Sequence, residues 1–149
     1  FLTKLRYTFT RLSTLPIPTV SAISSVAFGG GLELALTTTF RVFGSNAVVA
    51  LPETRLAIIP GAGGTYRLPA LVGTSRARDL VLTGRRVSAA EAYFIGLCDR
   101  LVEVTEGDSK EGGGDKKVLA QAVQLAREIC EGGPVAVGGG SLENVIECV

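Results

Sequence analysis

The opening residues of the chain place apolar side chains at the spacing of an amphipathic helix. Leu2, Leu5, Phe9 and Leu12 recur every three or four positions, with polar and basic residues between them. Pro16 follows shortly afterwards and cannot continue a helix. The pattern therefore predicts a surface helix that ends before this proline.

The next part of the chain alternates short apolar runs with one helical segment. Residues 19–28 and 46–51 are rich in branched and small side chains, which is typical of buried strands. Between them, three glycines at 29–31 lead into a predicted helix at about 32–38. A further run at 97–104 predicts an edge strand.

The second half of the chain carries clear helix signals. Residues 74–82 form one predicted helix, and Ser88 with Glu91 forms a capping box that opens another, which Gly96 closes. A longer helix is predicted at about 116–131. Strands that alternate with helices predict an α/β fold with parallel strands and flanking helices.

The predicted organisation is a core, an insertion and a C-terminal segment. Residues 1–104 carry the core pattern, while 105–115 is rich in glycine and charge and predicts a flexible surface insertion. Residues 116–149 form a helical segment whose tail after Pro134 has no clear periodicity.

Composition favours one globular domain and excludes several kinds of function. The chain has 149 residues, 46% of them hydrophobic, with 15 basic and 14 acidic side chains, so it carries no electrostatic footprint for nucleic acid or an anionic membrane. Prolines and glycines interrupt the apolar stretch 12–40 before it reaches the length of a membrane span. The absence of histidine excludes Ser-His-Asp and Cys-His nucleophile systems within this chain.

The cysteines and the first residues bear on location. Cys98, Cys130 and Cys148 are odd in number, widely spaced and without a CxxC pair, which favours ordinary thiols in a reducing compartment. The chain begins at Phe1 inside a patterned segment and without signal-peptide features. We expect it to be a piece of a longer protein.

The triple glycine with Glu33 is the first candidate site. A helix that begins at these glycines leaves its first N–H groups without intrahelical partners, and no Cβ blocks the approach of a ligand oxygen. Glu33 is the only charged residue between Leu12 and Phe40 and follows Gly30 by three positions. Its spacing alone fits a catalytic carboxylate and a helix cap about equally well.

The second candidate is Glu53, in a loop predicted at 52–69 with a short helix near its end. It stands at the exit of a predicted strand, a common position for site residues. On its own, a surface pair with Arg55 explains it better. The adjacent "GAGG" lacks the Lys-Ser/Thr of a phosphate-binding Walker loop, and Tyr66 replaces the last glycine of a GxGxxG motif.

Three ordered blocks of the sequence carry a resemblance to a known family. "AFGGGLELAL", "LPETRLAIIPGAGGTYRLP" and "LTGRRVSAAEAYFIGLCDRLVE" resemble the enoyl-CoA hydratase/isomerase (crotonase) family, and its methylglutaconyl-CoA hydratase branch most of all. By this resemblance Glu33 and Glu53 fall on the two catalytic glutamates, and Gly30 on the second amide of the oxyanion hole. Gly29 and Gly61 fall on positions that seat the water and the substrate.

The resemblance also implies a fold, a substrate and a setting. It implies a partial ββα spiral, an acyl-CoA substrate, no cofactor beyond the coenzyme A of that substrate and no metal. It further implies a homotrimer or a dimer of trimers in the mitochondrial matrix, with cytoplasm or peroxisome as alternatives. The other functions considered are isomerisation of a double bond by the same family and a catalytically silent fragment that only associates with complete subunits.

The sequence also departs from the family pattern. Ser25, Thr39 and Tyr66 replace the usual Gly, Asp and Gln. The family's first oxyanion donor and much of its coenzyme A surface lie before Phe1, and the tail after Pro134 replaces its C-terminal helices.

Two questions about basic residues arise from the resemblance. An RNA-binding relative exists, but Lys4, Arg6 and Arg11 match only part of its basic helix, so RNA binding is not expected. A substrate with a second carboxylate would need a nearby Arg or Lys, and the sequence does not identify which basic residue faces inward.

Overall fold

The computed structural model describes residues 1–110 and 113–133. In these residues, none of the helices combines the length and the apolar character that crossing a bilayer demands. The tail after Pro134 and Cys148 lie outside the described residues.

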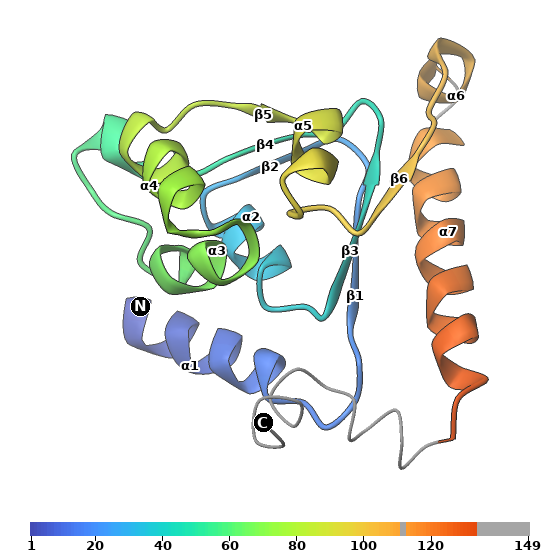
Figure 1. Cartoon of the computed structure of the whole chain (residues 1–149), viewed down its shortest axis with the longest axis horizontal. Helices are drawn as coiled ribbons and strands as arrows, with labels where there is room; N and C mark the ends of the chain where they lie inside the picture. Colours follow the sequence, from blue (N-terminus) through green and yellow to red (C-terminus); the bar gives the residue numbers. More distant parts are fainter. Residues whose placement is uncertain (111–112, 134–149) are drawn as a thin grey trace.

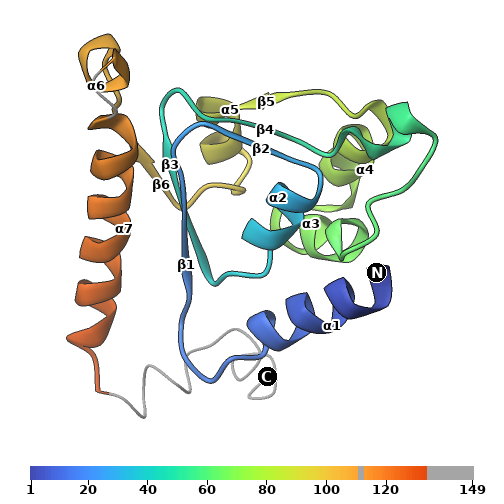
Figure 2. The same ribbon diagram turned by 180° about the vertical axis from the view of Figure 1, so that it is seen from behind.

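Helix α1 confirms the first prediction from the sequence. It spans Leu2–Ser13 and ends three residues before Pro16, with Phe9 buried beneath it. Figures 1 and 2 show its N-terminal end beside the loop that follows η1 (Pro52–Leu56). The first residues of the chain therefore lie close to the second candidate glutamate.

The strands form two small sheets. In the first, β3 (Phe40–Gly44) lies between β1 (Val20–Ile23) and β6 (Arg100–Val102), and all three strands are parallel. The predicted edge strand at 97–104 is confirmed in a shorter form. The predicted strand at 19–28 is in fact two strands, because the chain leaves the first sheet after Ile23 and enters the second.

The second sheet carries the strand that leads into the triple glycine. Strand β4 (Val48–Ala50) pairs in parallel with β2 (Val26–Phe28) and antiparallel with β5 (Val87–Ser88), which is an exception to the predicted parallel pairing. Figure 1 shows β2 and β4 running across the view, whereas β1 and β3 run along its vertical.

Short helices fill the space on one side of these sheets. They are α2 (Gly30–Ala35), α3 (Gly64–Val72), α4 (Thr74–Thr83) and α5 (Ala89–Phe94). The predicted helix at 32–38 therefore begins and ends earlier, and the loop at 52–69 contains η1 as well as the start of α3.

The capping box of α5 is formed only on one side. Ser88 Oγ accepts a hydrogen bond from the Glu91 amide at 3.2 Å, as predicted, and Gly96 follows the helix with a φ of 82°. The Glu91 carboxylate instead binds Arg85 through both oxygens. The helix boundary is thus fixed by the serine and the glycine.

Helix α7 covers the far face of the first sheet. It spans Gly113–Cys130 and lies along β1, β3 and β6 in both ribbon views. A short helix, α6 (Glu106–Lys110), precedes it, so the segment predicted as an irregular insertion contains a helical turn. The valines, alanine and leucine between α7 and the sheet form a second small core: Val42, Val102, Val104, Val118, Ala122 and Leu125.

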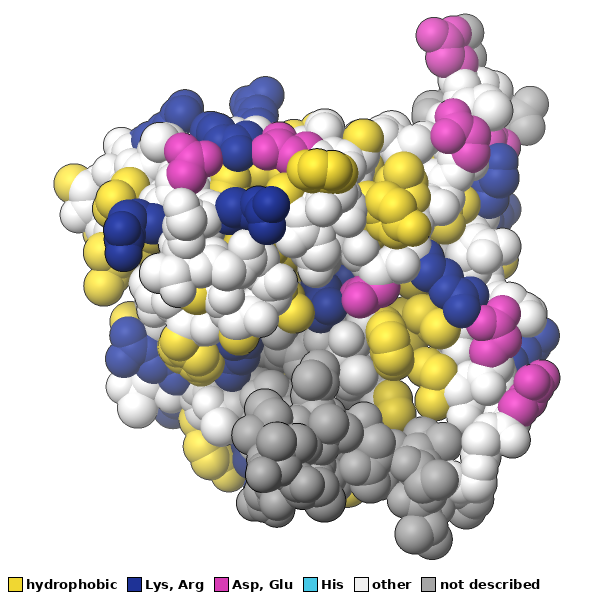
Figure 3. Space-filling model, viewed as in Figure 1, with side chains coloured by type: hydrophobic (Ala, Val, Ile, Leu, Met, Phe, Trp, Pro, Cys, Tyr) yellow, Lys and Arg dark blue, Asp and Glu magenta, His cyan; other side chains and the backbone are white. Residues whose placement is uncertain are grey.

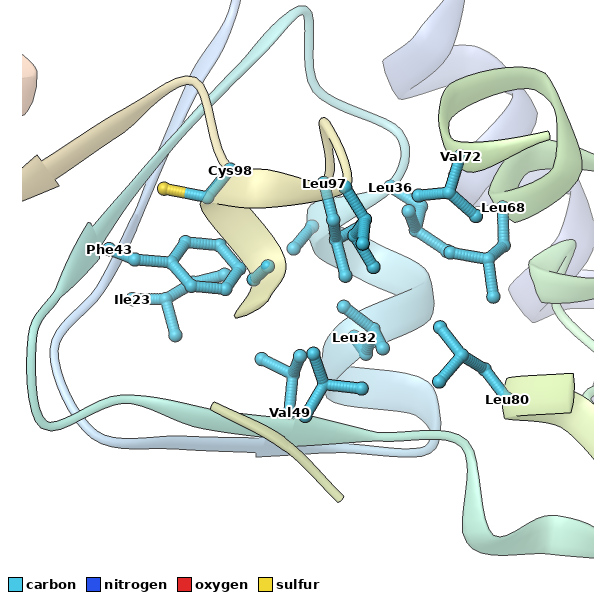
Figure 4. Packing of buried hydrophobic residues seen from close by; sticks show 14 of the residues in the cluster. Ile23, Leu32, Leu36, Phe43, Val49, Leu68, Val72, Leu80, Leu97 and Cys98 are labelled. Atoms are coloured by element: carbon cyan, nitrogen blue, oxygen red, sulfur yellow. The ribbon is translucent and has the colours of Figure 1, made fainter. Parts of the chain in front are cut away.

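The main core lies between the two sheets and helices α2 to α5. Figure 4 shows Ile23 and Phe43 side by side and Leu32 pointing toward Val49. Cys98 belongs to this cluster, and burial raises the pKa of its thiol to about 11, which agrees with an unreactive structural cysteine. The core fixes α2 against the sheets and so sets the position of Glu33.

Strand β3 was not predicted because a charge interrupts its apolar residues. That charge, Arg41, is 2% exposed and forms an ion pair of 2.8 Å with Asp99. Its guanidinium also donates to the carbonyl oxygens of Leu97 at 2.9 Å and Thr38 at 2.7 Å. A buried cation with these partners connects the end of α2 to both β3 and the start of β6.

Replacing Arg41 tests this connection. Arg41→Ala removes the guanidinium that binds the Leu97 and Thr38 carbonyl oxygens and breaks the ion pair with Asp99, which keeps only the backbone N–H of residue 41 as a donor, so we expect it to lower the free energy of unfolding by about 3 kcal/mol. Arg100→Ala, which breaks an exposed pair with Glu128, is the matched control and should cost less than about 1 kcal/mol. Urea unfolding measures both, and equal costs would contradict a structural role for Arg41.

Candidate active site

Both candidate glutamates border one cavity of about 800 Å³. Glu33 reaches it from α2 and Glu53 from η1, and both are buried, at 3% and 8% exposure. The other lining residues are glycines, apolar side chains and one arginine: Leu2, Leu5, Arg6, Phe28, Gly29, Gly30, Pro52, Leu56, Ala57, Ile58, Ile59 and Gly61.

Two backbone amides outside its own helix hold Glu33. The N–H groups of Ala62 and Gly64 both donate to Oε1 of Glu33, each at 2.8 Å. A helix cap would bind amides of the first turn of α2, so the capping interpretation is wrong. Because both of these bonds go to Oε1, Oε2 is left to meet a ligand.

The bond to Gly64 depends on its being glycine. A Cβ at this position would lie 3.1 Å from Glu33 Oε1 and at the same distance from side-chain atoms of Leu51 and Pro60. Such contacts are tighter than most packed atoms make, so the carboxylate or the loop would have to shift by a few tenths of an ångström. Neither Ala62 nor Gly64 was predicted from the sequence as a partner of Glu33, although both belong to the "GAGG" turn.

Glu53 lies in a different environment. The expected surface pair with Arg55 is absent from the described ion pairs, since the Nε group of Arg55 donates to the Thr83 carbonyl oxygen at 3.0 Å. Oε2 of Glu53 is buried and has no hydrogen-bond partner among the described residues. Burial raises the pKa of Glu53, its own backbone N–H opposes the rise, and the nearby Glu33 carboxylate adds to it.

Gly29 and Gly30 allow the backbone to approach these carboxylates. Gly29 has a φ of 54°, which side chains rarely adopt, and a Cβ there would lie 3.1 Å from Glu53 Oε1. Gly30 opens α2, so its N–H has no intrahelical partner, and a Cβ added to it would meet nothing within 4 Å. An amide without an intrahelical partner, at a glycine that lines the cavity, matches the requirements of an oxyanion donor.

Gly61 lies where α1 meets the cavity. A Cβ on Gly61 would be 3.0 Å from Leu2 Cδ1, and its carbonyl oxygen accepts a hydrogen bond from Arg6 Nε. The structure thus brings all five predicted residues, Glu33, Glu53, Gly29, Gly30 and Gly61, to one cavity. The roles expected for them remain predictions.

Known proteins resemble this chain along most of its length. The family profile described as enoyl-CoA hydratase/isomerase matches residues 2–138. An enoyl-CoA isomerase/hydratase of Zymoseptoria tritici is 70% identical over 138 residues, which cover 92% of this chain and 45% of the relative. Methylglutaconyl-CoA hydratase 1, mitochondrial, of Pyricularia oryzae is 60% identical over 149 residues, with 92% of this chain and 43% of the relative covered.

Solved structures agree with these sequence matches. The crystal structure of an enoyl-CoA hydratase from Bacillus anthracis superposes with a TM-score of 0.86 at 40% identity, covering 98% of this chain and 53% of that one. The chain spans roughly half the length of the relatives it matches. From the profile match and the shared α/β fold, we conclude that the chain belongs to the enoyl-CoA hydratase/isomerase family.

Proposed function

We propose that the protein carrying this chain is an enoyl-CoA hydratase, which adds water across the double bond of a 2-enoyl-CoA thioester. The observation that carries the proposal is the pair of buried glutamates on one cavity, one bound by two amides and the other with an unpartnered oxygen. Hydration needs one carboxylate to accept a proton and one carboxylic acid to donate one, and these environments supply that difference.

The proposed roles follow from the hydrogen bonds. Glu33, with Oε1 held by two amides, takes a proton from water as the oxygen bonds to the β-carbon of the acyl chain. Glu53, whose raised pKa favours the protonated form, gives its proton to the α-carbon. Proton exchange with solvent then restores both groups, and the net change is addition of one water molecule.

Polarisation of the thioester is assigned to the start of α2. Gly30 lines the cavity at the first position of α2, and its N–H would bind the thioester oxygen as negative charge develops there. The family resemblance assigns the second donor to a segment before Phe1. Gly29 and Gly61 keep the backbone close to the reacting groups and are proposed to seat the water and the substrate.

The names of the relatives support a substrate and a setting. The Pyricularia oryzae relative and a human relative that is 43% identical over 138 residues are both named mitochondrial methylglutaconyl-CoA hydratases. We therefore propose an acyl-CoA substrate of this kind and a mitochondrial location, with coenzyme A supplied as part of the substrate. Assembly as a homotrimer or a dimer of trimers is a further part of the proposal.

Isomerisation is the second candidate, since the relative at 70% identity is named for both reactions. The two reactions differ in their products. Hydration yields a 3-hydroxyacyl thioester, whereas isomerisation yields a shifted double bond. Two buried glutamates on one cavity favour hydration, and chromatography of the products would distinguish the outcomes.

Replacing each glutamate tests the catalytic roles. The protein for this test is the chain joined to the preceding segment of the Pyricularia oryzae relative, called here the extended chain. Glu33→Gln and Glu53→Gln should each lower its hydration rate about a hundredfold to ten-thousandfold, because each removes one proton-transfer group. Circular dichroism should show an unchanged fold, and near-normal turnover in either variant would contradict its role.

The pH dependence of stability tests the protonation of Glu53. Because its pKa is raised on folding, the stability that the protonated form provides is present below the ordinary value of 4.5 and is lost as the pH rises through the folded value. Glu53→Gln stays neutral. The free energy of unfolding of this variant, relative to the unmodified chain, should therefore increase between about pH 4 and pH 8.

Urea unfolding at a series of pH values measures this difference. Glu103→Gln, which removes a charge from an exposed position, controls for the general effect of losing a carboxylate. A difference between Glu53→Gln and the unmodified chain that does not change with pH would contradict the raised pKa.

The 149-residue chain by itself should be a poor enzyme. Without the second oxyanion donor the barrier should rise by about 2.7 to 4 kcal/mol, and the binding energy of the missing coenzyme A surface is lost as well. In the described residues, β1 and β2 each pair on one side only, which favours association. We expect little crotonyl-CoA hydration, weak thioester binding and an oligomer or aggregate.

Loss of the enoyl thioester absorbance and light scattering measure the two parts of this expectation. The extended chain is the control. A monodisperse 149-residue chain with the same turnover as the extended chain would show that the added segment contributes nothing to the site.

A further inference from the structure

One cation stands among the acidic and apolar residues of the cavity. Apart from Glu33 and Glu53, every lining residue in the described part of the chain is apolar or glycine, with the exception of Arg6. Arg6 comes from the second turn of α1, and its guanidinium lies near Gly61. A positive group at the wall of a reaction cavity would select the charge of the substrate.

A single peptide unit connects Arg6 to the proposed base. The carbonyl oxygen of Gly61 accepts a hydrogen bond from Arg6 Nε, and the N–H of the same peptide, which belongs to Ala62, donates to Glu33. In a trans peptide the carbonyl and N–H groups point in opposite directions. Two hydrogen bonds and one peptide therefore separate the guanidinium from the carboxylate, a path of less than about 9 Å.

Among the residues that the structure describes, Arg6 pairs with no acidic side chain. It takes part in none of the five described ion pairs, whereas Arg41, Arg85 and Arg100 each bind a carboxylate. Its only described hydrogen bond uses Nε. The two terminal nitrogens, which form the planar fork that fits a carboxylate, remain available in the described part of the structure.

From these contacts we propose that Arg6 binds a second carboxylate at the far end of the acyl chain. The preferred substrates would then be 2-enoyl thioesters of dicarboxylic acids, with the free carboxylate two carbon atoms beyond the hydrated carbon. Such a chain would extend along the cavity from a water beside Glu33 toward the guanidinium, since both residues line it. This inference rests on the proposed hydration, and it supplies the inward-facing basic residue that the sequence does not identify.

The competing explanation is purely structural. In that case Arg6 only connects α1 to the loop through its hydrogen bond to Gly61. Its removal should then lower kcat/KM for every substrate to the same degree. A third explanation is a contact with the coenzyme A portion, which is also common to all substrates. These two explanations predict that the loss of Arg6 leaves the ratio of rates for substrates with and without the second carboxylate unchanged. The proposal predicts that this ratio falls.

The experiment compares glutaconyl-CoA with crotonyl-CoA in the extended chain. Arg6→Gln should lower kcat/KM for glutaconyl-CoA about tenfold to a hundredfold, as expected for a lost charge-assisted contact, and change that for crotonyl-CoA less than about twofold. Arg6→Lys should give an intermediate loss. Arg11→Gln removes the same charge from an exposed position of α1 that does not line the cavity. It should leave kcat/KM for both substrates unchanged.

Binding of saturated analogues tests the same residue without chemistry. In calorimetric titrations, Arg6→Gln should weaken the binding of glutaryl-CoA but not the binding of butyryl-CoA. An equal loss for both analogues, or no loss for either, would overturn the inference. If the unmodified extended chain hydrates neither enoyl thioester, the proposed function fails, and the two titrations still decide whether Arg6 recognises a carboxylate.

Discussion

The site depends on the two hydrogen bonds that Ala62 and Gly64 donate to the buried carboxylate of Glu33. An ionised carboxylate at 3% exposure would be costly without such donors, because burial removes the water that stabilises its charge. The donors come from a turn 29 residues away in the chain, so α2 and the start of α3 have to pack together for the bonds to form. The hydrophobic core that includes Leu32 and Leu68 brings them together.

Glycines make this close packing possible, each for its own geometric reason. Gly29 adopts a φ of 54° beside Glu53, and a Cβ at Gly64 would crowd Glu33 Oε1 at 3.1 Å. Between Glu53 and Gly64, Ala57 adopts a φ of 57° although it is not glycine, and the side chains of Leu56, Ile58 and Ile59 are exposed. Figure 3 shows apolar side chains gathered on the surface over this part of the molecule. This part of the cavity wall therefore combines an unfavourable backbone conformation at Ala57 with exposed apolar side chains.

The sequence predicted the elements whose periodicity or punctuation is local. Helix α1 follows from its leucines and the proline after it, and α5 from Ser88 and Gly96. Strand β3 could not be predicted in this way, because Arg41 breaks the apolar pattern and its partner Asp99 is 58 residues distant. The division of 19–28 into two strands likewise depends on which sheet each half joins, which is a tertiary contact.

In the candidate site, too, the residues could be predicted from the sequence, whereas their contacts with residues distant in the sequence could not. The glycines and glutamates were found from their sequence and from family resemblance, but the partners of the glutamates were not. From spacing, Glu33 was equally compatible with a helix cap, and Glu53 favoured a surface pair. The hydrogen bonds that the distant residues Ala62 and Gly64 donate to Glu33 overturn the first interpretation, and the unpartnered oxygen of Glu53 overturns the second.

One peptide unit connects the two groups on which the proposed catalysis and the proposed choice of substrate depend. The Gly61–Ala62 peptide donates its N–H to Glu33 and accepts a hydrogen bond from Arg6 at its carbonyl oxygen. Because the peptide is planar and trans, its two hydrogen bonds cannot be reoriented independently. A substrate carboxylate that draws Arg6 toward the acyl chain would therefore act on the amide that orients the proposed base. In the proposed arrangement the separation between Arg6 and Glu33 would select the length of the acyl chain, while the Ala62 and Gly64 amides hold the carboxylate of Glu33 with or without a second carboxylate on the substrate.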